Sequence, residues 1–126
     1  QIPLAFVDLT SALPHTRAGK VHSLGTGGIQ RTLTAPDLAT LAENGVPGFD
    51  AKGWFGIIGP VGTPATIVDR LNGEINRVLN TPEIRDRAIA VGCEPATGTP
   101  EQFAGLIRSE IAKYAQAVKT ANLKVE

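Results

Sequence analysis

Residues 53–64, GWFGIIGPVGTP, limit what this chain can fold into more than any other part of the sequence. The apolar first half is typical of a short buried strand, and the glycine and proline run after it predicts a turn. Thr63 and Pro64 are then expected to be the N-cap and first residue of a helix, because threonine is a favoured cap and proline at N1 loses no hydrogen bond. A strand followed by a turn and a helix indicates an α/β chain.

Two further helices are expected to start at the same Thr-Pro pair. The first is predicted over residues 81–90 and is ended by Gly92, because glycine favours the position just after a helix. The second and longest is predicted from Pro100 to about Ala121, with Thr99 as its cap and Gln102 completing a capping box.

Apolar residues repeat at helical spacing in two of these helices, which predicts that one face of each is buried. In the helix over residues 64–80 they are Ile67, Leu71, Ile75 and Val78. In the last helix they are Phe103, Leu106, Ile107, Ile111, Tyr114 and Val118.

The first part of the chain is predicted to alternate in the same way. Residues 3–7 and 21–26 have the composition of short strands, and a helix containing Pro14 is expected between them, over residues 9–18. A short helix is expected over residues 35–43. Further strands are expected at residues 54–58 and 93–97, and the turn-rich residues 45–52 divide the chain.

Composition excludes several classes of protein. The 126 residues suffice for one compact core, and twelve basic residues balance twelve acidic ones, so no nucleic-acid partner is expected. The single cysteine, Cys93, excludes an internal disulfide and offers no metal cluster. No apolar run approaches the ~20 residues of a membrane span, and no signal peptide is recognised. The start at Gln1, inside strand-like sequence, predicts a processed, trimmed or truncated chain.

Motifs for catalysis or cofactors are weak. Residues 25–28, GTGG, follow a predicted strand, but Gln30 stands where the dinucleotide fingerprint needs glycine, so a strand-ending turn explains them better. His15 and His22 have no ligand at metal-binding spacing. A pairing of Cys93 with either histidine would need two distant segments to meet, and a half-buried structural thiol is the simpler interpretation. We therefore expect no enzyme, no cofactor and no metal.

The most suggestive charge pattern is the absence of any carboxylate between Asp8 and Asp37, where Arg17, Lys20 and Arg31 are all cationic. Such a segment would favour anionic small molecules. The alternative is a solvated surface whose opposite charges lie nearby in space.

The predicted helix over residues 9–18 begins directly after a strand, with Asp8, Thr10 and Ser11 at its start. Free N–H groups and the helix dipole suit carboxylates at such an end, and open α/β sheets bind ligands at strand-to-helix corners. Asp8 is expected either to cap the helix, which is the default interpretation, or to pair with an ammonium or hydroxyl group of a ligand.

Several segments, taken together and in order, resemble one family. They are residues 18–24 (AGKVHSL), Arg31, residues 36–45 (PDLATLAENG), 47–49 (PGF), 54–56 (WFG), 60–64 (PVGTP), 71–75 (LNGEI), Gly92 and residues 99–104 (TPEQFA). The chain is similar over nearly its whole length to the Bug-type extracytoplasmic solute receptors of tripartite tricarboxylate transporters.

The resemblance implies an α/β fold of the type II periplasmic-binding-protein architecture, in which two lobes close over a small organic carboxylate. It implies a periplasmic location and delivery of the ligand to the membrane permease subunits of the transporter. Residues 1–47 would belong to lobe two, residues 48–53 to the hinge or crossover, and residues 54–126 to lobe one. Asp8, Thr10 and Ser11 would face the ligand, while Gly48, Gly53 and Trp54 would lie near the hinge.

The chain departs from the family in length, because it matches only the carboxy-terminal part of a receptor. Three situations stay open: a piece of a receptor that lacks its amino-terminal half, a natural half-size relative, or a chain that pairs with its own copy. The competing hypothesis to a carboxylate receptor is a self-associating structural module that binds no small molecule. An enzyme would lose activity on changing His15, His22 or Cys93, whereas a receptor would be indifferent to Cys93→Ala.

Overall fold

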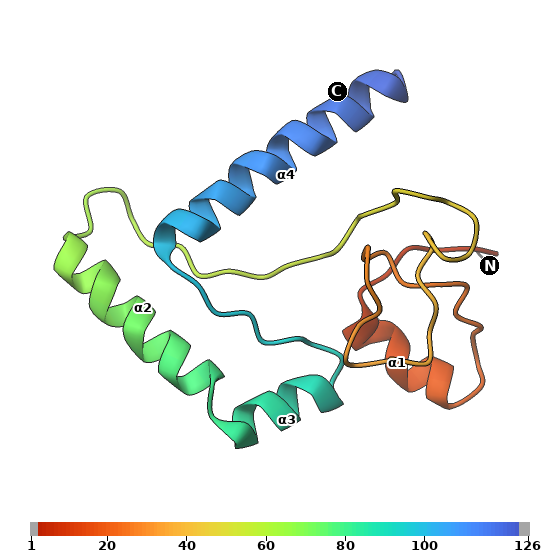
Figure 1. The fold of residues 1–126 in the computed structure, drawn as a ribbon, viewed down its shortest axis with the longest axis horizontal. Helices are drawn as coiled ribbons and strands as arrows, with labels where there is room; N and C mark the ends of the chain where they lie inside the picture. Colours follow the sequence, from red (N-terminus) through yellow and green to blue (C-terminus); the bar gives the residue numbers. More distant parts are fainter. Residues whose placement is uncertain (1–2, 124–126) are drawn as a thin grey trace. The chain divides into compact units, whose positions relative to one another are not determined.

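The computed structural model describes residues 3–123, which contain four α-helices joined by irregular segments (Figure 1). The helices are α1 (Leu9–Arg17), α2 (Ala65–Leu79), α3 (Pro82–Ala90) and α4 (Pro100–Thr120). The chain divides into two compact units: Gln1–Phe55 with Val78–Ala96, and Gly56–Arg77 with Thr97–Glu126. The first unit holds α1 and α3, and the second holds α4 and most of α2.

The start of α4 confirms the predicted capping box. The Gln102 N–H donates to Thr99 Oγ1 at 3.2 Å, and the Thr99 N–H donates to Gln102 Oε1 at 2.8 Å. Each bond satisfies a backbone donor that the first helical turn leaves without a partner. The helix then runs to Thr120, within one residue of its predicted end.

The other two Thr-Pro pairs do not cap through their hydroxyl groups. Thr81 precedes α3 as predicted, but its hydroxyl donates backward to the Val78 carbonyl at 2.7 Å. The Thr63 hydroxyl likewise donates to the Pro60 carbonyl at 2.8 Å, and α2 begins only at Ala65. The prediction of Thr63 as the cap was therefore wrong, because the turn before the helix takes its side chain first.

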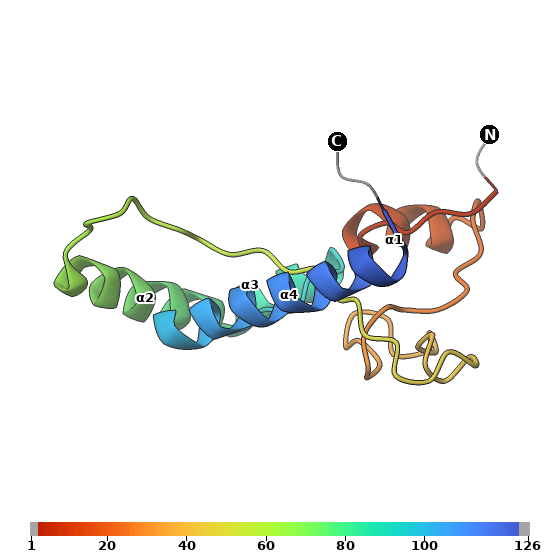
Figure 2. The ribbon, with the colours of Figure 1, turned by 90° about the horizontal axis from the view of Figure 1, so that it is seen from above.

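The predicted strands are not paired in the part of the chain that the structure describes. The single β-bridge there joins Thr26 to Thr40 in parallel, and the ribbons show helices and irregular trace only (Figures 1 and 2). Residues 3–7, 54–58 and 93–97 carry no ladder. Periodicity predicts which residues suit a strand, but a strand forms only where a second backbone lies along its edge.

The short helix expected over residues 35–43 is a series of turns. Thr40 and Glu43 bond each other reciprocally: the Thr40 N–H donates to Glu43 Oε2 at 2.7 Å, and the Glu43 N–H donates to Thr40 Oγ1 at 3.1 Å. This is the pattern of a helix start, but the chain leaves it at Gly45, where φ is +100°. Glycine there permits the left-handed conformation that ends the turn.

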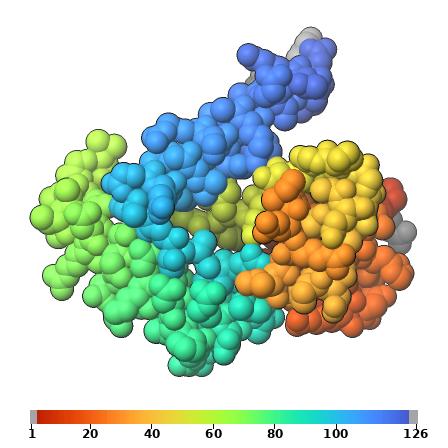
Figure 3. All heavy atoms as spheres, in the orientation of Figure 1, coloured from red at the N-terminus to blue at the C-terminus, as the bar shows by residue number. Residues whose placement is uncertain are grey.

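The first unit has a small core around α1. Leu13 is the one buried apolar side chain among the described residues, and Thr34 and Thr40 are buried as well. The Phe6 and Phe49 rings stack with their centroids 6.1 Å apart. On the face seen in Figure 3 the loops of this unit, in orange and yellow, form a continuous surface.

Two contacts organise the second unit. The side-chain amides of Asn72 and Asn76 on α2 both donate to the Gly98 carbonyl, at 3.0 and 2.9 Å, just before α4 begins. The Phe103 ring of α4 lies over Gly56, where an added Cβ would stand 2.0 Å from the ring. Only glycine fits at position 56 in this packing.

The predicted burial of the apolar helix faces is wrong for most of their residues. Ile67, Leu71 and Val78 of α2 are exposed, as are Leu106, Ile111 and Tyr114 of α4. Phe103, Ile107 and Val118 are half-buried. The helical periodicity is real, but the described residues cover these faces only in part.

We predict that Gly56→Ala destabilises the second unit by about 1–3 kcal/mol, because the new methyl group would overlap the Phe103 ring. Gly73→Ala is the matched control: nothing lies within 4 Å of its added Cβ, and alanine favours the interior of α2 by up to ~1 kcal/mol. Urea unfolding of both variants measures the difference. Equal midpoints for the two would contradict the packing of Phe103 on residue 56.

Candidate functional site

The start of α1 is the candidate site. The Asp8 carbonyl accepts hydrogen bonds from the N–H groups of Ser11 and Ala12, each at 3.0 Å. The N–H groups of Leu9 and Thr10 have no acceptor among the described residues. They therefore stay available to a ligand, together with the positive end of the helix dipole.

Asp8 occupies the cap position but does not cap with its side chain. Its backbone is extended, at φ −65° and ψ 142°, and its carboxylate makes no hydrogen bond to the first turn of α1. The default interpretation of Asp8 as a capping residue was therefore wrong. Asp8 and Ser11 are exposed, and Thr10 is half-buried.

Two glycines stand against this helix start. Asp8 Oδ1 lies 3.0 Å from the position that a Cβ on Gly53 would take. A Cβ on Gly92 would lie 3.1 Å from the Thr10 nitrogen, and Gly92 has φ +89°. Both positions therefore let a second backbone approach the first turn closely, which a larger residue would prevent.

An ion pair joins the segments that carry these glycines. Lys52, next to Gly53, donates to Glu94 Oε2 at 2.7 Å, and Glu94 follows Gly92 by two residues. Glu94 Oε1 also accepts from the Thr32 hydroxyl and the Leu33 N–H, each at 2.5 Å. Residues 52–53 and 92–94, which both reach the α1 start, are thus joined through one carboxylate.

Opposing effects act on the pKa of the Glu94 carboxyl. Burial raises it, but hydrogen bonds from Lys52, Thr32 and Leu33 together outweigh burial, so the pKa is lowered from its usual value. Glu94 therefore stays ionised at neutral pH, and its charge is matched by the Lys52 ammonium. The three hydrogen bonds that Glu94 accepts thus join parts of the first unit that are distant along the chain.

The cationic stretch between Asp8 and Asp37 is partly neutralised. Arg31 Nε donates to both carboxylate oxygens of Glu43 at 3.0 Å, so opposite charge does lie nearby in space. The Thr40 N–H and then Arg31 lower the pKa of Glu43. Arg17 and Lys20 form no ion pair with any residue from 3 to 123.

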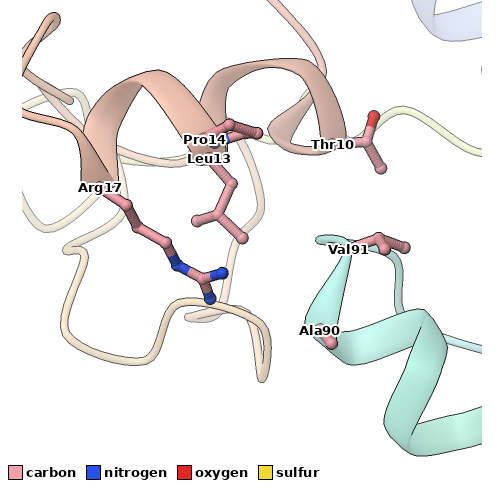
Figure 4. A pocket seen from close by; sticks show the side chains of 6 residues that line it. All are labelled: Thr10, Leu13, Pro14, Arg17, Ala90 and Val91. Carbon is pink, nitrogen blue, oxygen red and sulfur yellow. The ribbon is translucent and has the colours of Figure 1, made fainter.

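Two open hollows lie along α1, and neither includes Asp8 or Ser11. The first, about 190 Å³ in volume, is lined by Thr10, Leu13, Pro14, Arg17, Ala90 and Val91 (Figure 4). The second, about 350 Å³ in volume, shares Leu13 and Arg17 with it and is otherwise lined by Thr16 and residues 34–38. Sequence reasoning did not find either hollow.

The three expected hinge residues differ in their surroundings. Gly48 lies in the turn closed by the Phe49 N–H bond to the Val46 carbonyl, and its φ of +78° needs glycine. Gly53 lies beside Asp8, and the Trp54 side chain is 42% exposed.

Sequence reasoning placed Asp8, Thr10 and Ser11 together correctly, because they are neighbours in one helix turn. It missed Lys52 and Glu94, which are 42 residues apart along the chain and match no motif. Gly92 was expected only as a helix stop, although a glycine can also mark a close backbone approach.

Within residues 3–123, no group of three or more His, Cys, Asp or Glu side chains could hold a metal ion. Over the same part of the chain, no helix is long and apolar enough to cross a membrane.

Comparison with known proteins identifies the family. The model of the tripartite tricarboxylate transporter family receptor matches residues 1–123. The chain belongs to this family. It is 32% identical over 119 residues to the protein BugT of Bordetella pertussis, covering 94% of this chain and 36% of BugT.

Solved structures agree with this receptor family. R. palustris Rpa4515 with adipate matches at 32% identity and a TM-score of 0.82, over 90% of this chain and 38% of that one. The periplasmic binding protein BugD matches at 27% identity and a TM-score of 0.79, over 91% and 39%. MatC from Rhodopseudomonas palustris with bound malate matches at 33% identity and a TM-score of 0.73, over 87% and 38%.

These matches confirm the predicted fold class, so the chain has the fold of part of a two-lobed periplasmic binding protein. The chain spans a little over a third of the length of BugT and of Rpa4515. At the family level the function is that of a solute-binding receptor and not of an enzyme.

We predict that Gly92→Ala lowers the free energy of unfolding of the first unit by about 2–3 kcal/mol. It combines the strain of a positive φ with a contact to the Thr10 backbone. Gly19→Ala shares the positive φ but has nothing within 4 Å, so it should cost only about 1–2 kcal/mol. Urea unfolding of the two variants measures the extra cost of the contact, and no difference between them would argue against it.

Glu94→Gln should destabilise the first unit by about 1–3 kcal/mol at pH 7, because its hydrogen bonds lose their charge. Since folding lowers the Glu94 pKa, this stabilisation is complete above the unfolded value near 4.5 and is lost as pH falls through the folded value. Wild type and variant should therefore converge in acid.

Chemical denaturation from pH 7 down to pH 3 measures this convergence. Glu83→Gln, in an exposed pair on α3, is the control and should change stability by less than about 0.5 kcal/mol. A constant gap between wild type and Glu94→Gln at every pH would contradict the ionised three-donor arrangement.

Proposed function

We propose that this chain forms part of a periplasmic receptor that captures a small organic carboxylate and delivers it to the membrane permease subunits of a tripartite transporter. The observation that carries the proposal is the start of α1, where the Leu9 and Thr10 N–H groups have no acceptor among the described residues and two glycines lie close by. The adipate and malate held by two solved relatives support a carboxylate as the ligand class.

Asp8, Thr10 and Ser11 are the proposed ligand-binding residues. A ligand carboxylate would accept hydrogen bonds from the Leu9 and Thr10 N–H groups and from the two hydroxyls, which is the anion chemistry of a helix start. The Asp8 carboxylate repels such a group at close range, so Asp8 would accept a hydrogen bond from a ligand hydroxyl or ammonium instead. The site would thus favour substituted acids over plain diacids.

We further propose that the receptor closes about a hinge, with residues 1–47 in lobe two, residues 48–53 in the crossover and residues 54–126 in lobe one. Gly48 supports a hinge at this segment through its left-handed backbone. Gly53 and Trp54 follow it along the chain, and Gly53 lies beside Asp8. Closure at these residues would couple ligand capture to a change recognised by the permease.

Asp8→Asn in a receptor containing this sequence should weaken malate binding about tenfold, because the ligand hydroxyl loses a charged acceptor. Adipate has no hydroxyl, so its affinity should stay the same or rise as the repulsion disappears. Isothermal titration with both acids measures the two changes. Asp86→Asn on α3 is the control, since this exposed carboxylate lies outside the proposed site.

The proposed site would be abandoned if Asp8→Ala and Thr10→Ala both left carboxylate affinity unchanged. An alternative function, a self-associating module without a ligand, draws support from the exposed apolar faces of α2 and α4. A chain that forms a discrete oligomer and binds none of the acids would favour that alternative.

A further inference from the structure

We propose that the hollow between α1 and residues 34–38 binds a small amino acid as a zwitterion, with its carboxylate on Arg17 and its ammonium group on Asp37. This hollow, about 350 Å³ in volume, includes neither Asp8 nor Ser11 in its wall. It is therefore a second site on the first unit, separate from the start of α1. The inference does not rest on the proposed function.

Two opposite charges line this hollow without pairing. Arg17 and Asp37 both belong to its wall, and both residues are exposed. They form no ion pair with each other, and neither side chain makes an ion pair or hydrogen bond with any other residue from 3 to 123. An anion alone would be repelled by Asp37, and a cation alone by Arg17. A ligand with one charge of each sign complements both.

The two hydroxyl groups of the wall can only accept further hydrogen bonds. The Thr16 hydroxyl donates its proton to the Ala12 carbonyl at 3.1 Å. The Thr32 hydroxyl donates its proton to the ionised Glu94 carboxylate. Thr34 Oγ1 lies 2.8 Å from Thr32 Oγ1, so Thr34 has to be the donor of that bond. Because a hydroxyl has one proton, the Thr16 and Thr34 oxygens keep acceptor capacity alone.

An ammonium group matches this set of acceptors. It has three N–H donors and no acceptor, and the wall supplies the Asp37 carboxylate with the hydroxyl oxygens of Thr16 and Thr34. The Arg17 guanidinium is the charged donor of the wall, and its planar fork suits a carboxylate. The polar side chains therefore fit an amino acid better than a plain acid, which would bring no donor for the three acceptors.

The rest of the wall is apolar, which favours an amino acid with a hydrocarbon side chain. Leu13 precedes Arg17 by about one helical turn, so both side chains point from the same face of α1 (Figure 4). Ala35, Pro36 and Leu38 add apolar surface from the loop. A volume of about 350 Å³ lies at the lower end of the range for ligand pockets, so a molecule of the size of leucine suits it.

The loop side of the hollow is held in place before any ligand binds. Arg31 Nη1 donates to the Pro36 carbonyl at 3.2 Å, and the Leu38 N–H donates to the Ala35 carbonyl at 3.1 Å. The bond from Thr32 to Glu94 fixes the start of this loop. A ligand that enters a preformed wall avoids the entropy cost of ordering it.

The test is an NMR titration of the full chain with leucine, followed through the Leu38 amide and the Leu13 methyl groups. Both signals should shift and saturate. Arg17→Gln and Asp37→Asn should each weaken binding by about tenfold or more, because each removes one charge-assisted contact. A parallel titration with γ-aminobutyrate shows which separation of the two charges fits. Binding of either amino acid that depends on both residues supports the inference.

The matched controls are Lys20→Gln and Asp86→Asn, which each remove an exposed charge that lines neither hollow. Both should leave the affinity for leucine unchanged. Isocaproate, which is leucine without its ammonium group, should bind the unaltered chain at least about tenfold more weakly than leucine. This comparison needs no variant, so it holds even where a substitution changes folding.

Three results would overturn the inference. The first is the absence of a saturable shift with both amino acids. The second is isocaproate binding as tightly as leucine, because the ammonium group would then contribute nothing. The third is an affinity for leucine that falls with Asp8→Asn and not with Asp37→Asn, which would assign the amino acid to the start of α1. A chain that binds leucine in this hollow and no malate would contradict the proposed function alone.

Discussion

The arrangement around α1 depends most on the hydrogen bonds that the Glu94 carboxylate accepts. They come from Lys52, Thr32 and Leu33, three groups from two distant segments. The Lys52–Glu94 ion pair also joins the two segments whose glycines lie against the helix start. Gly53 is next to Lys52, and Gly92 is two residues before Glu94. A single half-buried charge therefore organises a region that contains little apolar core, since Leu13 is its one buried apolar side chain among the described residues.

Helices were predicted well because their signals are local. The capping box of Thr99 and Gln102 lies within one turn, and the bounds of α4 follow from it. The predicted strands did not form a sheet in the described residues. A strand needs a second backbone beside it, and the periodicity of one segment does not show whether such a backbone is there. Thr63 shows the limit for helices, since a turn to Pro60 competed for its hydroxyl and moved the start of α2.

In the candidate site, too, the sequence predicts the local features and misses the contacts between distant residues. Asp8, Thr10 and Ser11 could be grouped from sequence because one helix turn holds them, whereas the expected side-chain cap of Asp8 did not form. The contacts that hold the site, from Lys52 to Glu94 and from Gly92 to Thr10, join residues far apart along the chain, so no spacing rule could predict them. Two solved relatives hold adipate and malate, and the start of α1 is where we propose that a carboxylate binds to this chain.

The most direct measurement is a crystal structure of a receptor that contains this sequence, grown with malate. We expect a ligand carboxylate oxygen within hydrogen-bond distance of the Leu9 and Thr10 N–H groups, and the ligand hydroxyl against Asp8. Malate bound elsewhere in the receptor, with the Leu9 and Thr10 N–H groups of α1 facing only water, would contradict the proposed site.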